Sequence, residues 1–372
     1  MKKKINKYDF LIIGGGLIGS IAALALQQKN FKVVVLEKNK KVIDNRTLAV
    51  NSNSKNFLTS LGLWGNFNKK PENIDKIIIK DYVNDEPLIF ENQKPMGYVA
   101  YNQEILKKAR SKLLKSHSLI YNLDFCLNDI LGKKKIIYKN QLYQFKNIIL
   151  SIGKNFNLPH AISKKNFNSE HKSYVGFFNH LKNHQNIAYE IFTKEGPLAV
   201  LPAPKKDKKQ STFIFSTKNN ISKQKLKSLL SLYFNGSHGS INLLPSISNF
   251  DLAPHLSKSV NDNYILIGDT MRSIHPVAGQ GWNLGIKDIQ TLCSLLETLQ
   301  VDNPQLNSLY HSRRIIESTA YLIFTSLINA LYDNENFVSH NVIKFGYQSL
   351  LNIDALRASF VKQAMGEVSL IG

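Results

Sequence analysis

The sequence predicts an α/β fold built around a parallel β-sheet, and strand–helix patterns in two stretches predict it. Near the N-terminus, an apolar strand pattern at Tyr8–Ile13 is followed by a helical stretch at Ser20–Gln28 and a second apolar strand at Phe31–Leu36. Far along the chain, the apolar run Tyr264–Ile267 has the length of one buried strand, and a helical stretch begins near Trp282. Parallel strands that are joined by helices are the building blocks of such sheets.

The connection between the first strand and its helix is rich in glycine and reads Gly14-Gly15-Gly16-Leu17-Ile18-Gly19. Gly14 permits a tight turn, Gly16 lets the backbone approach a pyrophosphate, and Gly19 lets helix and strand pack closely. Glu37 ends the second strand, about 20 residues further on, where an acidic side chain can hold ribose hydroxyls. This Rossmann-like unit predicts a dinucleotide ligand, and both FAD and NAD remain open at this point.

The second stretch, residues 264–288, offers a contact for a polyol and a contact for an anion. Gly268 and Asp269 end its strand, and a carboxylate at a strand end can accept hydrogen bonds from sugar hydroxyls. The run 279–281, Gly-Gln-Gly, leads into the helix near Asn283 and lets backbone N–H groups come close to a ligand. The positive end of that helix would face an anion. A plain glycine-rich loop of an α/β domain is the alternative.

This stretch resembles the second flavin-binding motif of the single-component aromatic hydroxylases, and in detail that of their ubiquinone-biosynthesis branch. The pattern of that branch is GD, then HP, then AGQGxNxGxxD. The matching positions are Gly268, Asp269, His275, Pro276, Ala278, Gly279, Gln280, Gly281, Asn283, Gly285 and Asp288. The resemblance implies FAD as the cofactor, with Asp269 on the ribityl chain and Glu37 on the adenosine ribose. It also implies a para-hydroxybenzoate-hydroxylase-like fold, in which a Rossmann-like FAD-binding domain is interleaved with a β-sheet substrate domain and followed by C-terminal helices.

The resemblance implies further flavin contacts outside the two loops. Arg46 lies in a segment that resembles the family pattern D-x-R-[TA]-x-A-[LV], although a surface arginine in a turn is the alternative. Gln103 begins a helix where relatives usually carry an arginine near the flavin chain. Pro202 ends the run GPLAVLP, where the family's proline approaches the flavin edge, and a strand-ending proline is an equal alternative. The residues expected beside the flavin ring are Pro202, Pro276, Gly279, Gln280 and Gly281.

The main departure from the family follows the apolar strand at 147–150. Most members have A-D-G-x-x-S-x-x-R there, a motif implicated in flavin and nicotinamide binding, whereas this chain has Ser151-Ile152-Gly153-Lys154. Ile152 takes the aspartate position, where an apolar side chain cannot accept a hydrogen bond from a ribose hydroxyl, and His160 takes the arginine position. The resemblance implies NAD(P)H as the transient electron donor, and Ile152 leaves another donor open.

The same resemblance divides the chain into three regions. The expected regions are a discontinuous FAD-binding domain at 1–73, 102–160 and 250–300, a substrate-binding sheet domain at 74–101 and 161–249, and a C-terminal helical region at 301–372. Strand patterns at 74–82 and 97–101 are expected to begin the substrate-side sheet. Ala364-Met365-Gly366 matches the family's closing A-M-G.

Composition and charge narrow the choice of partners and of compartment. The 372-residue chain has a net charge of +21, but its cations are spread out and accompany no zinc, helix-turn-helix or RNA-binding signature. Nucleic acid is therefore not the expected partner, whereas an anionic membrane surface or an acidic partner stays open. Cys126 and Cys293 show no metal-binding or CxxC spacing, so a reducing compartment and no metal are expected. No apolar run is expected to span a membrane.

The resemblance implies an FAD-dependent monooxygenase that hydroxylates a polyprenylated phenol or benzoquinol precursor of ubiquinone, with O₂ and a flavin C4a-hydroperoxide. It implies a cytoplasmic protein, and attachment to the inner face of the membrane or to a quinone-biosynthesis complex stays open. Two rivals remain. One is another flavin oxidoreductase of the same fold, and the other is a non-catalytic flavoprotein subunit. No side chain is expected to act as a nucleophile, and His275 is expected to be a structural loop residue.

Overall fold

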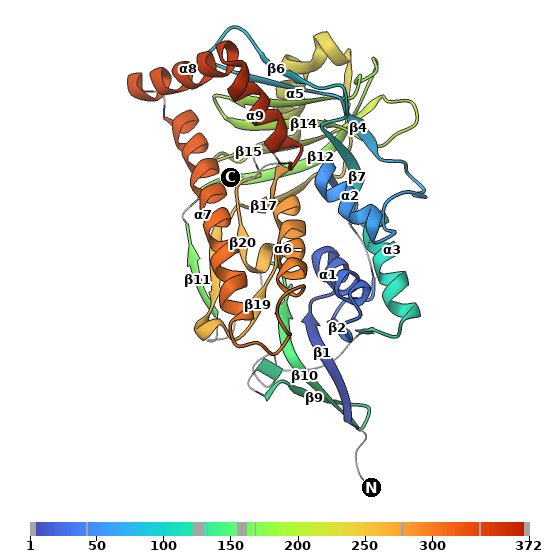
Figure 1. Cartoon of the computed structure of the whole chain (residues 1–372). Helices are drawn as coiled ribbons and strands as arrows, with labels where there is room; N and C mark the ends of the chain where they lie inside the picture. Colours follow the sequence, from blue (N-terminus) through green and yellow to red (C-terminus); the bar gives the residue numbers. More distant parts are fainter. Residues whose placement is uncertain are drawn as a thin grey trace.

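In a computed structural model, two β-sheets lie one above the other and a long helix runs along their side (Figure 1). The structure describes residues 5–41, 44–121, 130–131, 133–154, 162–167, 169–276, 279–334 and 336–367. In Figure 1 the lower sheet is covered by helices, the larger sheet occupies the upper half, and helix α7 stands on the left. Cys126, His160 and Ala278, which the sequence analysis singled out, lie outside the described residues.

The lower sheet is parallel at its centre, where its strands are buried on both faces. Its order is β19 (Ile265–Leu266), β10 (Gln141–Leu150), β1 (Ile5–Ile13), β2 (Val33–Glu37) and β8 (Leu119–Tyr121), with β9 (Lys135–Tyr138) antiparallel to β10. The unbroken apolar runs of β1 and β2 suit such central strands, which meet helices or loops on each side. The predicted strands at Tyr8–Ile13, Phe31–Leu36 and Tyr264–Ile267 are confirmed.

Three helices pack on one face of the lower sheet and share a hydrophobic core with it. They are α1 (Leu17–Gln28), α3 (Asn102–Lys115) and α6 (Gly281–Leu295). Ile12 of β1, Ile21 of α1 and Ile286 of α6 are fully buried in this core. α1 and α6 approach closely, because a Cβ on Gly285 would lie only 2.8 Å from Ile18. The two glycine loops that precede these helices are thereby held close together.

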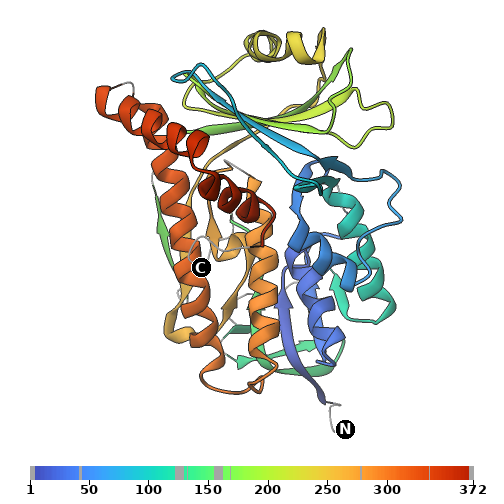
Figure 2. The ribbon, with the colours of Figure 1, turned by 45° about the horizontal axis from the view of Figure 1, so that its top comes forward.

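The upper sheet is the large one and is mostly antiparallel. Its order is β16 (Ile241–Leu243), β12 (Lys172–His180), β15 (Gln210–Thr217), β14 (Gly196–Pro202), β13 (Ile187–Thr193), β5 (Lys76–Asp81) and β6 (Leu88–Glu91), and β17 (Ser248–Asp251) also pairs with β12. Helix α5 (Lys223–His238) covers the outer face of this sheet, as Figure 2 shows. Leu230 and Phe234 of α5 pack there against Phe178 and Phe213.

Two small sheets connect the large ones, and one of them corrects a prediction. The first is β3 (Thr47–Asn51), β7 (Gly97–Tyr101) and β4 (Glu72–Ile74), and the second is β11 (Ile162–Asn166), β18 (His255–Ser259) and β20 (Arg272–Ser273). The sequence analysis placed 97–101 in the substrate-side sheet, and this was wrong. β7 pairs with β3, where Ala100 lies opposite Leu48, and helix α2 (Ser52–Ser60) follows β3 directly. A strand pattern predicts burial of alternate residues but does not name the partner strand.

Three helices at the C-terminal end tie the two large sheets together. They are α7 (Leu306–Asp333), α8 (Phe337–Asn352) and α9 (Asp354–Ala364). α8 and α9 cover β6, and the rings of Phe90 and Phe360 lie 4.5 Å apart there. The carbonyl oxygen of Met365 then accepts a hydrogen bond from the N–H of Asn53 at 3.3 Å. The end of α9 thus reaches the start of α2, beside the lower sheet.

Helix α7 is long and apolar enough to cross a membrane by length and composition alone, which the sequence analysis did not expect. Only a minor share of its most apolar stretch is buried in the protein. The side that is buried carries Arg314 and Glu317, which a bilayer interior would disfavour. We therefore interpret α7 as a helix that packs on α6 through a polar side and exposes an apolar side.

Three histidines form a buried cluster between the large sheet and α5. The ring of His180 lies 4.6 Å from that of His238 and 6.1 Å from that of His184, measured between centroids. Burial lowers the pKa of His184 to about 4 and that of His238 to about 3, and it also lowers the pKa of His180. The rings are therefore neutral at physiological pH, and charging them would oppose folding.

We expect this cluster to make the protein less stable as the pH falls through the ordinary histidine range. A histidine whose pKa is lowered in the folded state stabilises the fold above its unfolded pKa and loses that contribution below it. Between about pH 6.5 and about pH 5, His184 and His238 should each cost about 2 kcal/mol of the free energy of unfolding. Urea unfolding should show a weaker pH dependence for His238→Phe but not for the exposed control His117→Asn. An unchanged pH dependence in His238→Phe would refute this.

Candidate active site

The glycine loop between β1 and α1 is tightly packed at two of its predicted glycines and open at the third. Gly14 has a φ of +101°, and a Cβ there would lie 2.1 Å from the carbonyl oxygen of Ser151. A Cβ on Gly19 would lie 1.9 Å from the carbonyl oxygen of Gly14. Gly16, the N-cap of α1, has no such neighbour within 4 Å. The helix N-terminus therefore faces open space at Gly16, which is the geometry that an anionic pyrophosphate needs.

Glu37 lies at the carboxyl end of β2, beside this loop, and Arg110 of α3 holds it in place. The Glu37 carboxylate accepts the N–H of Asn39 at 2.7 Å and pairs with the Arg110 guanidinium at 3.1 Å. Arg110 also donates to the carbonyl oxygens of Gly15 at 2.9 Å and Asn39 at 2.8 Å. One buried arginine thus fixes the glycine loop relative to the acidic residue. Sequence reasoning missed Arg110, because it lies in the middle of a helix and belongs to no motif.

The second loop starts where β19 ends, at the short 3₁₀ helix η2 (Gly268–Thr270). The Thr270 hydroxyl accepts the N–H of Gly153 at 3.0 Å, so the loops after β10 and β19 are joined. The Asp269 side chain is accessible to solvent in this corner. Partial desolvation raises the pKa of its carboxyl group, and the nearby cations Lys154, Arg272 and Arg46 act in the opposite direction.

A buried ion-pair network fixes the position of Gly268 and therefore of Asp269. One Asp288 oxygen accepts the backbone N–H of Gly268 at 2.8 Å. The other accepts from Arg272 and from Arg314, each at 2.8 Å. Glu317 pairs in turn with Arg314 and with Lys287, and the Arg314 pKa is raised by these carboxylates although burial opposes it. The network connects β20, α6 and α7 beneath the loop.

The run Gly279–Gly281 leads directly into α6, which begins at Gly281. Gly279 has a φ of +59°, and a Cβ there would lie 3.3 Å from Ala49 of β3. The Asn283 side chain bridges to β3, since it donates to the Ala49 carbonyl oxygen at 3.0 Å and accepts the Asn51 N–H at 3.1 Å. One N–H and the oxygen of this side chain are thus engaged by the protein. Its backbone N–H in the first turn of α6 and its second amide N–H are the donors that it could offer to a ligand.

Arg46 and Gln103, the two other predicted cofactor contacts, lie near each other at the start of α3. Arg46 makes a two-point ion pair with Asp44 at 2.8 and 2.9 Å, and this pair raises the Arg46 pKa, with a further contribution from Asp269. The Gln103 amide donates to the Asn45 side-chain oxygen at 3.3 Å. The guanidinium is mostly exposed and lies on the same side of the site as Asp269.

Pro202 and Pro276, which were both predicted to lie beside the flavin ring, belong to different parts of the fold, and the ring of His275 lies beside that of His171. Pro276 lies in the second loop, where its carbonyl oxygen accepts the N–H of Gly279 at 3.0 Å. Pro202 lies in the large sheet, opposite Ser211 of β15, and its approach to a flavin stays a prediction. The His275 ring lies 5.6 Å from that of His171, and both of its nitrogens are buried without a partner among the described residues. Burial lowers the pKa of His275 to about 3, so the ring is neutral.

Ile152, at the position where the family usually has an aspartate, packs against the core beside β10. The position therefore contributes apolar packing. Two residues later, Lys154 lies close enough to Asp269 and Arg46 to interact with them electrostatically, and burial lowers its pKa. Lys154 had no assigned role in the sequence analysis, because a single lysine after a strand is not a recognisable signal.

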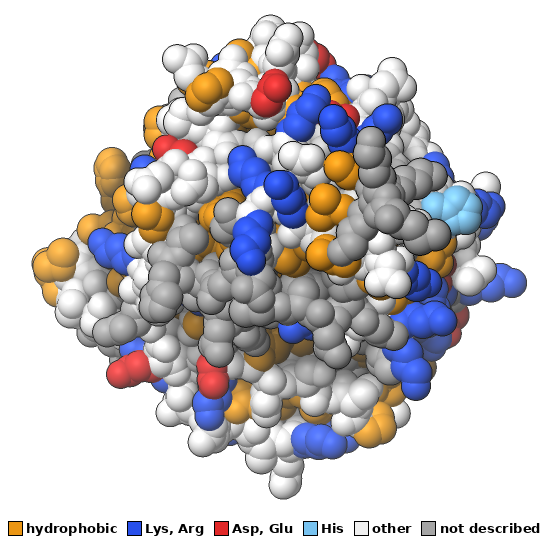
Figure 3. Space-filling model, turned by 90° about the horizontal axis from the view of Figure 1, so that it is seen from below, with side chains coloured by type: hydrophobic (Ala, Val, Ile, Leu, Met, Phe, Trp, Pro, Cys, Tyr) orange, Lys and Arg blue, Asp and Glu red, His pale blue; other side chains and the backbone are white. Residues whose placement is uncertain are grey.

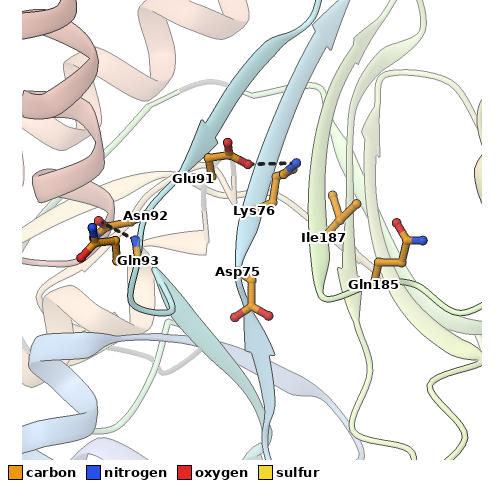
Figure 4. Close-up of a pocket in the computed structure, with 7 residues that line it drawn as sticks. All are labelled: Asp75, Lys76, Glu91, Asn92, Gln93, Gln185 and Ile187. Atoms are coloured by element: carbon orange, nitrogen blue, oxygen red, sulfur yellow. Dashed lines mark hydrogen bonds and ion pairs between the residues drawn. The ribbon is translucent and has the colours of Figure 1, made fainter.

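Two surface hollows differ sharply in character. One lies at the edge of the large sheet (Figure 4) and is lined by Asp75, Lys76, Glu91, Asn92, Gln93, Gln185 and Ile187. Most of its lining residues have polar or charged side chains, it contains the Lys76–Glu91 ion pair at 2.9 Å, and it includes none of the predicted site residues. The other lies beside Arg110, which contacts the glycine loop between β1 and α1, and is lined by Lys40, Lys107, Arg110, Ser111, Leu114, Lys115 and Tyr121. Its cations suit a phosphate-bearing ligand at the Glu37 end of the site.

Comparison with known families identifies the ligand of this site. The family described as FAD binding domain matches residues 7–118 and 179–321, which together make up more than half of the chain. The chain belongs to this family. The matched residues include the glycine loop, Glu37, Arg46, Asp269 and the start of α6. The cofactor of this protein is FAD, as predicted.

Relatives and solved structures resemble nearly the whole chain. The ubiquinone hydroxylase UbiL of Rhodospirillum rubrum is 24% identical over 97% of this chain and 90% of its own length. The human mitochondrial ubiquinone biosynthesis monooxygenase COQ6 is 25% identical, over 87% of this chain and 85% of its own length. The p-nitrophenol 4-monooxygenase PnpA of Pseudomonas putida has a TM-score of 0.74 at 12% identity and covers 97% of this chain and 98% of its own. A Klebsiella pneumoniae HpxO variant complexed with FAD has a TM-score of 0.70 at 13% identity, over 98% and 100% of the two chains.

These comparisons confirm the predicted resemblance, the fold class and the enzyme class, an FAD-dependent monooxygenase. The site also fits FAD on its own geometry. Gly16 leaves open space at a helix N-terminus, which a pyrophosphate would fill. Asp269 offers a solvent-accessible carboxylate at a strand end, and Glu37 is fixed at the end of β2. The assignment of individual side chains to parts of the cofactor stays a prediction.

We expect Asp269→Asn to weaken FAD binding by about 10- to 100-fold, because a carboxylate is the stronger acceptor for ribityl hydroxyls. The same change should not lower the stability of the apoprotein near neutral pH. Since the pKa of Asp269 is raised in the folded state, its charge costs stability once the pH exceeds that pKa, and asparagine removes this cost. FAD titration by fluorescence and urea unfolding of the apoprotein would measure both effects. Asp302→Asn, at an exposed position, is the control, and equal FAD affinities in the two variants would contradict the assignment.

Proposed function

We propose that the protein hydroxylates the aromatic ring of a polyprenylated phenol or benzoquinol intermediate in ubiquinone biosynthesis. The names of relatives that match nearly the full chain support the pathway, since UbiL and COQ6 are a ubiquinone hydroxylase and a ubiquinone biosynthesis monooxygenase. The geometry that carries the proposal is the close approach of the β19 end to α1, since a Cβ on Gly268 would lie 3.3 Å from Ile18, which brings Gly16, Asp269 and the start of α6 to one site.

The residues that would hold FAD extend along this site. Gly16 and the N-terminus of α1 would receive the pyrophosphate, Glu37 the adenosine ribose and Asp269 the ribityl chain. Arg46 and Lys154 would add positive charge near Asp269. When bound, the flavin supplies the chemistry that activates O₂ for transfer of one oxygen atom to an electron-rich ring.

The protein's own residues have three tasks beside the cofactor. The first turn of α6, whose backbone N–H groups have no partner within the helix itself, would stabilise negative charge on a reduced flavin. The Asp288 network holds Gly268 so that Asp269 and the loop keep their positions. The large sheet and the C-terminal helices would exclude water from the reacting ring, as such a reaction requires.

We propose NAD(P)H as the electron donor, although the residue at position 152 differs from the family pattern. The partly buried Ile152 side chain packs against the core, and the two neighbouring loops are linked through Gly153 and Thr270. Nicotinamide would therefore have to be held by other groups, among which Lys154 lies nearest to Asp269 along this loop. The same observation supports a second candidate, a flavoprotein subunit of a quinone-biosynthesis complex that binds FAD without hydroxylating. A third possibility lies between these two: the protein hydroxylates its substrate but receives electrons from a separate reductase.

A polyprenylated substrate would have to leave a membrane or a carrier complex to reach this site. We propose that the protein acts in the cytoplasm and meets its substrate at the inner face of the membrane. Nucleic acid is not proposed as a partner. Figure 3 shows that the face seen from below carries many lysine and arginine side chains and few acidic ones, in keeping with the net charge of +21. Such a surface is attracted to anionic lipid headgroups.

Product analysis with labelled oxygen tests the function. Purified holoprotein would be incubated with ¹⁸O₂, NADH or NADPH and a short-chain prenylated phenol, and the products would be analysed by mass spectrometry. Incorporation of a single labelled oxygen atom into the ring supports the hydroxylase. If FAD is bound but no product forms, even with added flavodoxin- or ferredoxin-type reductases, the non-catalytic alternative is favoured.

A further inference from the structure

The C-terminal helices expose an unusual concentration of large apolar side chains. Half of the exposed large apolar side chains in the described part of the chain belong to α7 and α8. They are Leu309, Ile316, Ile323, Phe324 and Leu327 of α7, and Phe337, Val338, Val342 and Phe345 of α8. We refer to these nine residues as the C-terminal apolar ridge. Exposed apolar side chains that are concentrated on two successive helices in this way indicate an interaction site rather than ordinary surface composition.

The spacing of these residues places them on one side of each helix. On α7, Ile316, Ile323 and Leu327 are separated by seven and four residues, which is the spacing of one helical face. On α8, Val338, Val342 and Phe345 have the same kind of spacing, while Ile343 and Tyr347 occupy the opposite, buried side. Each helix therefore packs on the protein through one side and presents an apolar side outwards. In Figure 1, α7 and α8 follow one another at the left side of the molecule.

The charges on these helices favour an anionic partner. Among the described residues of α7 and α8, the acidic side chains are Glu317 and Asp333, and both are already ion-paired. Glu317 is buried with Arg314, and Asp333 pairs with His171 at 3.3 Å and with Lys218 at 3.2 Å. The exposed cations Arg313 and Lys344 are left beside the ridge. An apolar helix face with flanking cations and a net charge of +21 is the signature of a helix that lies in a membrane interface.

We propose that the C-terminal apolar ridge docks this protein on the surface of an anionic lipid bilayer. The Phe337 and Phe345 rings, 81% and 77% exposed, would insert between the lipid headgroups, and Lys344 and Arg313 would contact the phosphates. A second copy of this chain is disfavoured as the occupant, because two chains of net charge +21 repel each other. The proposal rests on exposure and charge and does not depend on the identity of the aromatic substrate.

The docked surface belongs to the helices that cover the substrate-side sheet. α8 packs on β6 through Tyr347, whose hydroxyl donates to the Ile79 carbonyl oxygen at 3.0 Å and accepts the Leu88 N–H at 2.9 Å. The ridge is thus rigidly attached to the large sheet. Membrane docking through it would keep that sheet beside the lipid phase.

Vesicle flotation tests the proposal with full-length holoprotein. We expect binding to phosphatidylcholine vesicles that contain phosphatidylglycerol, and weaker binding at high salt or to vesicles of phosphatidylcholine alone. The double variant Phe337→Ser/Phe345→Ser should bind on the order of 100-fold more weakly, since two large side chains no longer leave water. The control is Leu232→Ser on α5, at a position that is 76% exposed and lies outside the ridge. It should bind like the wild type.

Two further readouts separate this proposal from its rivals and from the proposed function. FAD absorbance and hydroxylation of a short-chain, water-soluble phenol should be unchanged in the double variant, because the replaced rings lie on the surface. Failure of that hydroxylation in the wild type would refute the function but not the docking. Equal vesicle binding by the double variant and the Leu232→Ser control would overturn the docking. A different result would also overturn it: the wild type forms a dimer in analytical ultracentrifugation, the double variant does not, and the wild type fails to bind vesicles. The ridge would then be an interface between two copies of this chain.

Discussion

Gly16→Val should abolish FAD binding and leave the apoprotein folded. A Cβ at Gly16 would meet no protein atom within 4 Å, and the residue has a φ of −65°, which any amino acid can adopt. The added side chain would instead occupy the space in front of the α1 N-terminus, where the pyrophosphate is expected. We expect the dissociation constant for FAD to rise by at least about 100-fold. Isothermal titration of the apoprotein with FAD would measure it.

A second open glycine provides the matched control for this experiment. Gly236 in α5 also has no neighbour within 4 Å of an added Cβ, and it lies on the far side of the large sheet from the site. Gly236→Val should therefore bind FAD with wild-type affinity. The thermal midpoints of both apoproteins should stay close to that of the wild type. Wild-type FAD affinity in Gly16→Val would show that the first glycine loop does not hold the cofactor.

Asp288→Ala should be among the most destabilising single changes in this protein. Asp288 is completely buried and accepts hydrogen bonds from Gly268, Arg272 and Arg314. Its removal leaves the buried Arg272 without the carboxylate that it pairs with and leaves Arg314 with Glu317 as its partner, and an uncompensated buried charge costs about 3–5 kcal/mol. Urea unfolding should show a loss of that size. FAD affinity should fall as well, because the Gly268 N–H loses the acceptor that positions Asp269.

An exposed ion pair provides the control that shows whether burial causes the large loss of stability expected for Asp288→Ala. Glu297 pairs with Lys29 at 2.7 Å, but its side chain is largely exposed. Glu297→Ala should change the free energy of unfolding by less than about 1 kcal/mol. Asp288→Asn, which keeps an oxygen for the Gly268 N–H and loses the charge, should have an intermediate effect. Equal losses in Asp288→Ala and Glu297→Ala would refute the structural role assigned to the network.

The features that sequence analysis predicted well are encoded locally. The order of strand, glycine loop and helix at 8–37 and at 264–299 follows from neighbouring residues, because turn geometry and helical periodicity act over a few positions. The structure adds that Gly14 and Gly19 are packed against backbone while Gly16 faces open space. This explains why one short motif can combine a structural and a binding role.

The features that sequence analysis missed depend on contacts between distant segments. Arg110 meets Glu37 across 73 positions of the chain, and Arg314 meets Asp288 from the following helix. Neither arginine has a local pattern that distinguishes it from a surface cation. β7 was assigned to the wrong sheet for the same reason, since its partner β3 is chosen by the packing of the whole domain. The exposed apolar side of α7 could not be assigned from the sequence either, because an apolar stripe does not tell whether it faces the core or a partner.

The most direct test of the central claim is anaerobic reduction of the FAD-loaded protein in a stopped-flow instrument. The holoprotein would be mixed with NADH or NADPH, with and without a prenylated phenol, and the flavin absorbance followed. We expect the flavin to be reduced, and the phenol to accelerate its reduction, as in a hydroxylase that uses its cofactor only when substrate is bound. A bound flavin that neither nucleotide reduces, with or without the phenol, would contradict an NAD(P)H-dependent hydroxylase.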